Sequence, residues 1–123
     1  MKYSLKTSFA RWVLVLFFAI LALTVVGRLV TLTGASAYCA GFPFCAPDQP
    51  LGWLKQTHII LVGMASVFMF LVLRKAWREQ RDQSVLLPLT TILGVMFFGQ
   101  VLVGAMQVIQ SYPAHLVLLH TLT

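Results

Sequence analysis

Charged residues are scarce in this chain, and acidic residues are almost absent. Of 123 residues only 10% are charged, with three Asp or Glu against nine Lys or Arg, while 59% are apolar. Soluble domains carry about 25% charged and about 45–50% apolar residues. The composition therefore excludes an ordinary soluble protein and predicts a membrane protein, with no room at this length for a separate soluble domain.

Long apolar runs alternate with short polar segments along the chain. The predicted segments are transmembrane runs at 12–32, 53–73 and 85–110, an incomplete run at 114–123, an outer loop at 34–52 and a cytoplasmic connector at 74–84. A helix needs roughly 20 residues to cross the hydrocarbon core, and the last run has about half of that. The pattern predicts one all-α domain over 1–123, a polytopic membrane protein with three transmembrane helices plus the start of a fourth, of antiparallel four-helix-bundle type.

The net charge of +6 does not indicate nucleic-acid binding, because the basic residues are sorted by position along the chain. Loops rich in Lys and Arg stay in the cytoplasm. Most of the basic residues fall on one side of the predicted topology: Lys2, Lys6, Arg11, Arg74, Lys75, Arg78 and Arg81. We therefore expect a multi-pass protein of the cell membrane, with a cytoplasmic N-terminus and connector and an extracytoplasmic cysteine loop.

The two cysteines lack the spacing of the common cysteine motifs. Cys39 and Cys45 enclose Gly41 and Pro43, which can bend the backbone enough to bring the sulfurs together. Outside the cytoplasm such a pair favours a disulfide, with either a structural or a redox role. There is no C-x-x-C, no ligating His close by for zinc and no dinucleotide fingerprint, so a soluble nicotinamide cofactor is not expected.

Two of the three histidines are expected at similar depth on the outer side. His58 lies just inside the outer end of the second run, and His120 lies about two turns into the fourth. Facing imidazoles on neighbouring helices can hold a haem iron from both axial positions. The alternative is that each ring only forms hydrogen bonds in the bundle, although an ionisable group at membrane depth indicates function. His115 points to another face and is expected at the lipid headgroups.

One face of the third run combines amide side chains with a glycine. Gln100, Gly104 and Gln107 stand at i, i+4 and i+7, a pattern that usually serves helix packing. The same face is also suited to border a flat macrocycle, where glycine leaves room. On the first run, Arg28 lies near the outer end and is expected to snorkel or to be paired.

Four motifs follow one another along the chain. They are G-R-L-V-T-L-T-G at 27–34, C-A-G-F-P-F-C at 39–45, Q-V-L-V-G-A at 100–105 and P-A-H-L-V-L-L-H at 113–120. In this order and spacing they resemble the heme A synthase family, over nearly the whole chain from Gly27 onward. That family has eight spans in two four-helix halves and oxidises the methyl group of heme O to the formyl group of heme A for terminal oxidases. The resemblance is to its N-terminal half.

The resemblance implies a membrane oxidoreductase that binds haem, as heme b or as its substrate heme O and product heme A. It makes His58 and His120 the axial iron ligands and Cys39 and Cys45 an outer disulfide. The remaining implied pocket residues are Gln100, Gly104 and, near the propionates, Arg28. The implied partners are the lipid bilayer, a second half or a second copy of the chain, and heme O synthase or oxidase assembly proteins.

The chain departs from the family pattern beside its first histidine. The family commonly has a Glu three residues before that His and an Arg just after it, where this sequence has Lys55 and Ile59. Lys55 thus occupies the catalytic position and supplies a cation for a haem propionate. Other functions stay open: a haem-binding subunit or b-type electron carrier without catalysis, a quinone-linked thiol oxidase that uses Cys39 and Cys45, and a structural or assembly subunit.

Overall fold

The computed structural model describes residues 7–39, 41–44, 48–110 and 112–122, and in these ranges it confirms the predicted all-α membrane fold. The elements are α1 (Thr7–Thr33), the 3-10 helix η1 (Ala35–Tyr38), α2 (Pro50–Glu79), α3 (Leu86–Ile109) and α4 (Ala114–Leu122). Helices α1, α2 and α3 are long and apolar enough to cross a membrane. A helix satisfies its backbone hydrogen bonds internally, which is what an apolar chain in lipid requires.

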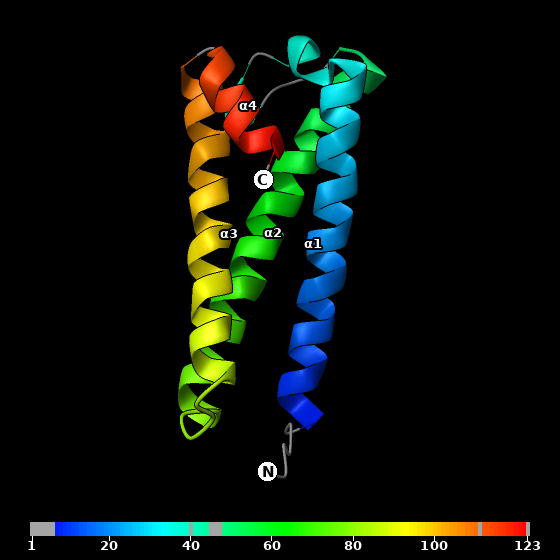
Figure 1. Cartoon of the computed structure of the whole chain (residues 1–123). Coiled ribbons are helices and arrows are strands. Elements are labelled where there is room, and N and C mark those ends of the chain that lie inside the picture. Colours follow the sequence, from blue (N-terminus) through cyan, green and yellow to red (C-terminus); the bar gives the residue numbers. More distant parts are fainter. Residues whose placement is uncertain (1–6, 40, 45–47, 111, 123) are drawn as a thin grey trace.

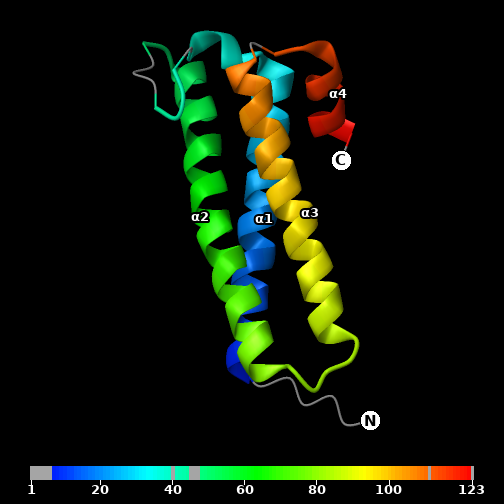
Figure 2. The ribbon, with the colours of Figure 1, turned by 90° about the vertical axis from the view of Figure 1, so that its left-hand side faces the viewer.

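The helices run antiparallel in chain order (Figures 1 and 2). We call the end with η1 and the α3–α4 turn the loop end, and the end with the α2–α3 turn the connector end. Helix α2 is central, because it packs on α1, α3 and η1, whereas α4 packs on α3. With nine residues, α4 spans about 13 Å and stays near the loop end. Among the described residues, the loop end therefore gathers four α-helices together with η1, and the connector end three α-helices.

The helix bounds differ from the predicted spans mainly in α2. This helix begins at Pro50 and continues to Glu79, so that it takes up part of the predicted outer loop and part of the predicted connector. Hydropathy marks where a chain leaves the bilayer, whereas a helix continues as long as its residues favour it. The last turns hold good helix formers and a pair between Lys75 Nζ and Glu79 Oε1 at 2.8 Å.

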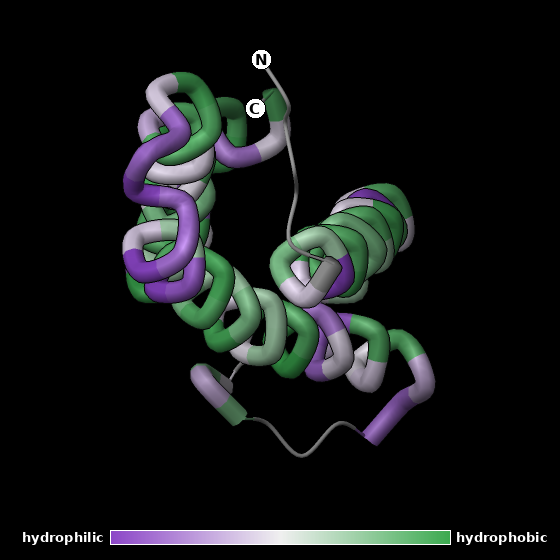
Figure 3. Tube along the Cα trace, turned by 90° about the horizontal axis from the view of Figure 1, so that it is seen from below, coloured by the Kyte–Doolittle hydropathy of each residue, from purple (hydrophilic) through white to green (hydrophobic). Residues whose placement is uncertain are grey.

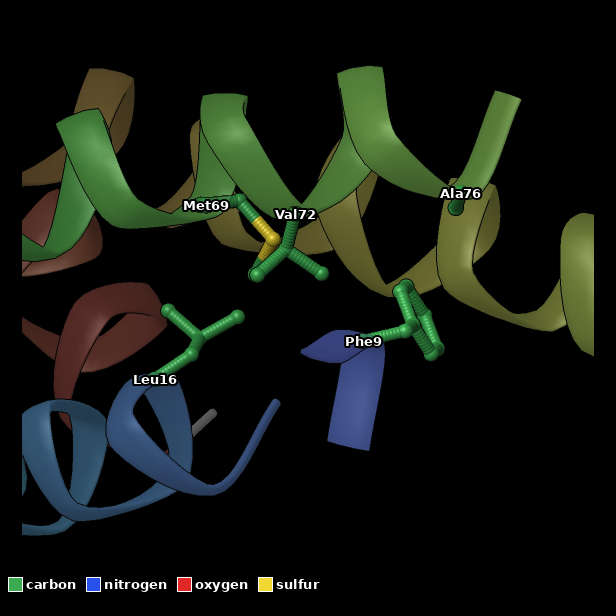
Figure 4. Packing of buried hydrophobic residues seen from close by; sticks show 5 residues of the cluster. All are labelled: Phe9, Leu16, Met69, Val72 and Ala76. Atoms are coloured by element: carbon green, nitrogen blue, oxygen red, sulfur yellow. The ribbon is translucent and has the colours of Figure 1, made fainter. Parts of the chain in front are cut away.

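An apolar core joins α1 and α2 toward the connector end (Figure 4). Phe9 and Leu16 of α1 pack against three buried residues of α2, which are Met69, Val72 and Ala76. The rings of Trp12 and Phe68 extend this contact, with centroids 6.0 Å apart. This packing holds the first hairpin together at a distance from the histidines.

Helix α3 approaches α2 closely at a glycine. A Cβ atom at Gly94 would lie 2.7 Å from Cδ1 of Leu73, which is too close for a real side chain. The glycine therefore lets the two helices pack against one another at this level.

The outside of the long helices carries many large apolar side chains. Hydrophobic residues make up most of each helix when the bundle is viewed from the connector end (Figure 3). Large side chains such as Leu32 at 81%, Val95 at 69% and Phe70 at 61% exposure face outward. Such a surface suits lipid and not water, which agrees with a multi-pass membrane protein.

Candidate functional site

His58 lies near the loop end of α2, and its ring rests on α1. The ring is half-buried, and its Cε1 lies 2.8 Å from the point that a Cβ would occupy at Gly27. The Nδ1 atom is buried and makes no well-formed hydrogen bond among the described residues, although the carbonyl of Leu23 on α1 is close to the ring. The predicted ligand therefore has a ring nitrogen that the described protein groups leave unsatisfied.

His120 is placed in the same way in the second hairpin. Its Cε1 lies 2.9 Å from the point that a Cβ would occupy at Gly104 on α3. Its Nδ1 lies 3.2 Å from Oε1 of Gln100 on the same helix. An amide oxygen only accepts hydrogen bonds, so Nδ1 carries the proton and Nε2 keeps its lone pair. Iron-ligating histidines are commonly oriented by this kind of second hydrogen bond.

The structure brings His58 and His120 toward one another from opposite hairpins. They are near enough for a charge on one imidazole to act on the other. Within the described ranges there is no group of three or more His, Cys, Asp or Glu side chains that would hold a bare metal ion. A haem needs only two protein ligands, and a pair of imidazoles is a suitable donor set for its iron. The residues present therefore fit a haem.

Lys55 is almost fully buried, at 4% exposure, and connects three elements of the loop end. Its ammonium donates a hydrogen bond to the carbonyl oxygen of Cys39, after η1. It also lies 5.9 Å from the ring centroid of Tyr112 in the α3–α4 turn. These contacts hold the loop end together, and the predicted catalytic role of Lys55 stays a prediction.

The other predicted site residues are spread around this pair. Arg28 directly follows Gly27 and is exposed on α1. His115 is exposed on α4, away from the interior. Cys39 is buried at 3% exposure. Its predicted disulfide partner, Cys45, lies outside the described residues, so the pairing stays a prediction.

Two further polar groups lie buried close to the loop end: Gln107, which the sequence placed on one face with Gln100 and Gly104, and Tyr112, to which it assigned no role. The hydroxyl of Tyr112 and Oε1 of Gln107 are buried without a hydrogen-bond partner in the described part of the chain. Tyr112 has a φ of 62°, in the left-handed region that is uncommon for a large side chain. A proline directly after the tyrosine in a short turn is the sequence signal that could have drawn attention to this residue.

Gly27 is the other residue whose contact with the site was missed. In the sequence Gly27 stands out only as part of the end of the first run, because its partner His58 lies far along the chain. The shared feature of Gly27 and Gly104 is a glycine within an apolar helix, which costs helix stability and so calls for a packing reason.

An apolar groove of about 660 Å³ runs along another side of α2. Phe44, Ile60, Met64 and Phe68 are among its lining residues, and none of the predicted ligands is. The histidine pair is thus separate from this groove.

Comparison with known proteins gives one relative. The chain is 28% identical over 93 residues to the protoheme IX farnesyltransferase of Chloroflexus aurantiacus, a match that covers 72% of this chain and 16% of that protein. The match thus spans about a sixth of the length of the curated relative. No family model matches the chain, and no solved structure matches it.

This relative contradicts the resemblance to the heme A synthase family. By its name it is a transferase that acts on protoheme IX, so the predicted oxidation of heme O to heme A and the assignment as an oxidoreductase are wrong. Small residues at close helix contacts are common in membrane bundles of many functions. These motifs are therefore compatible with several membrane proteins, and they did not identify the reaction.

Proposed function

We propose that this chain is a haem-binding membrane module in which His58 and His120 hold the iron of protohaem IX or of its farnesylated product. The observation that carries the proposal is the placement of the two imidazoles. They come from α2 and α4, lie near one another at the loop end, and each rests on a glycine of the preceding helix.

Different residues of the chain would orient the iron ligands, bind the propionates and exclude water. Gln100 orients His120 and keeps its Nε2 available for iron. Lys55 lies three residues before His58 on α2, and Arg28 follows Gly27, the residue on α1 that contacts the His58 ring; we assign these two cations to the propionates. The apolar faces of the helices keep water from the macrocycle. Bound here, the haem would be presented at the loop end as a substrate or product of haem modification.

The relative supports the assignment of haem as the ligand and limits what can be proposed about the reaction. Its name describes a transferase that acts on protoheme IX, but the match covers 16% of its length. We therefore assign haem binding to this chain. We assign farnesyl transfer only to an assembly of this chain with further protein. A second copy or a second four-helix half is a suitable partner, because the outer faces of α2 and α3 are apolar.

We also place the loop end outside the cytoplasm and the N-terminus inside. The distribution of basic residues supports this orientation. It can be measured by labelling single cysteines introduced at exposed positions at each end, such as Gln49 and Arg81, with a thiol reagent that does not cross membranes. If a cysteine at position 81 is labelled in intact cells and one at position 49 is not, the orientation is the opposite of the one proposed.

The proposed function is tested by titrating the detergent-purified chain with hemin. The wild type should give the absorption spectrum of six-coordinate low-spin iron with one haem per chain, and His58→Ala and His120→Ala should lose it. His115→Ala is the matched control, since this exposed histidine lies on the same helix as His120. An unchanged spectrum in both ligand variants refutes the assignment.

A further inference from the structure

Both histidines lie edge-on against a glycine of the helix that precedes them in their hairpin. In the first hairpin, a Cβ at Gly27 would lie 2.8 Å from Cε1 and 3.3 Å from Nδ1 of His58. In the second, a Cβ at Gly104 would lie 2.9 Å from Cε1 and 3.3 Å from Nε2 of His120. The two hairpins thus repeat one arrangement, with a glycine on the first helix of the hairpin and a histidine on the second.

A side chain at either glycine would displace the imidazole. Real Cβ atoms essentially never approach another heavy atom within 3.0 Å, so an alanine would force the ring or the helix to move. The ring is rigid, and its two torsions move Nε2 together with Cε1. In the second hairpin the hydrogen bond between His120 and Gln100 further restricts where the ring can go.

Other glycines in the long helices show that this contact is specific. A Cβ at Gly63 on α2 or at Gly99 on α3 would meet nothing within 4 Å. Alanine is also the better helix former, by about 1 kcal/mol. A glycine-to-alanine change therefore does not weaken a helix by itself, and its effect at each position reports on the space around it.

We propose that Gly27 and Gly104 are positioning residues that set the placement of the two imidazoles that would hold the iron. The inference rests on the proposed function, because it concerns how the same two histidines reach iron. Gly27 acts on His58 and Gly104 acts on His120, and neither glycine touches the iron. Because ligand-orienting groups commonly change metal affinity on the order of 10–100-fold, we expect a loss of that size in hemin affinity for each alanine variant.

The test uses the full chain in detergent, loaded with hemin. Gly27→Ala and Gly104→Ala are compared with Gly63→Ala and Gly99→Ala by hemin titration, by electron paramagnetic resonance of the ferric iron and by the midpoint potential. The two controls should match the wild type. The two positioning variants should bind hemin on the order of 10–100-fold more weakly, with a low-spin signal that is shifted or partly replaced by high-spin iron. Millimolar free imidazole should restore the low-spin signal, because an untethered ring can bind without the glycine.

A double-variant comparison separates positioning from a general packing defect. In a His58→Ala background the ring is gone, so adding Gly27→Ala should cause no further loss of hemin affinity, of helicity or of apo-protein thermal stability. The same holds for Gly104→Ala in a His120→Ala background. This comparison remains informative if Gly27→Ala alone fails to fold, since the double variant should then fold.

The outcomes distinguish this inference from the proposed function. If the wild type and the ligand variants bind hemin alike, the proposed function fails and the positioning role fails with it. If the wild type binds through both histidines but Gly27→Ala and Gly104→Ala keep its affinity and signal, only the positioning role is overturned. It is also overturned if the glycine changes are equally damaging with and without the histidine.

Discussion

Nδ1 of His120 lies 3.2 Å from Oε1 of Gln100, which stands twenty residues earlier in the chain. This contact joins the short helix α4 to α3 by a polar interaction at membrane depth. It also selects the tautomer of the ring, because the amide oxygen accepts the Nδ1 proton.

Replacing Gln100 with Leu should weaken haem binding without removing a ligand. The leucine keeps an apolar helix surface but leaves Nδ1 of His120 without its acceptor, so both ring orientation and ligand basicity change. We expect a loss of hemin affinity on the order of 10–100-fold, measured by optical titration. Gln110→Leu is the control, since Gln110 is exposed at the end of α3. Equal affinities of the two variants would show that Gln100 does not orient His120.

Replacing Lys55 with Met should loosen the loop end. The change removes the hydrogen bond from Lys55 to the Cys39 carbonyl and the cation near Tyr112. Loss of a charged hydrogen bond in a buried position costs about 1–3 kcal/mol. We expect lower thermal stability and faster hydrogen exchange in residues 35–39. Lys75→Met should cost well under 1 kcal/mol, because its partner Glu79 lies on the same part-exposed helix face.

The Lys55 variant also separates two roles for this residue. If the ammonium mainly holds the loop end, hemin affinity in Lys55→Met should change less than in Gln100→Leu. A larger loss of hemin affinity, with unchanged exchange in residues 35–39, would assign the ammonium to a propionate instead.

A larger side chain at Gly94 should separate α2 from α3. Gly94→Val would overlap the side chain of Leu73, since even a Cβ there lies 2.7 Å from its Cδ1. Overpacking of this kind costs about 1–3 kcal/mol. Adding Leu73→Ala should recover part of the loss, and unfolding of the single and double variants in denaturing detergent gives the coupling. Additive losses would contradict a direct contact.

Shortening Met69 should destabilise the chain and leave the haem spectrum unchanged. Met69→Ala opens a space in the core between α1 and α2 and should cost about 2 kcal/mol or more. The core lies toward the connector end, so the positions of the hemin absorption bands should match the wild type. Met64→Ala is the control, because Met64 is 51% exposed. A spectral change in Met69→Ala would show that the two ends are coupled.

The helices could be predicted from the sequence because lipid imposes one strong requirement, a long apolar run with internal hydrogen bonds. The ends of α2 could not, because the turn from Arg74 to Glu79 is polar and yet helical. Hydropathy reports where the chain meets water, and the residues of that turn favour a helix on either side of the boundary.

The placement of the candidate residues was predictable where it depends on one helix at a time. The position of His58 and His120 near one end of the bundle follows from their depth along two helices, and the shared face of Gln100 and Gly104 follows from their spacing, whereas their role in binding stays a prediction. The contacts of Gly27 with His58 and of Lys55 with Cys39 join different elements, so no pattern within one helix reveals them. The reaction was not predictable either, because motifs that suit a haem in a membrane are shared by enzymes with different chemistry.

The position of the apolar core has a consequence for assembly. Phe9, Leu16, Met69, Val72 and Ala76 pack α1 against α2 without any contribution from α4. The first hairpin can therefore be inserted and packed without α4, the helix that carries His120. If haem binds as proposed, its uptake would follow the packing of the first hairpin and would be a late step of maturation.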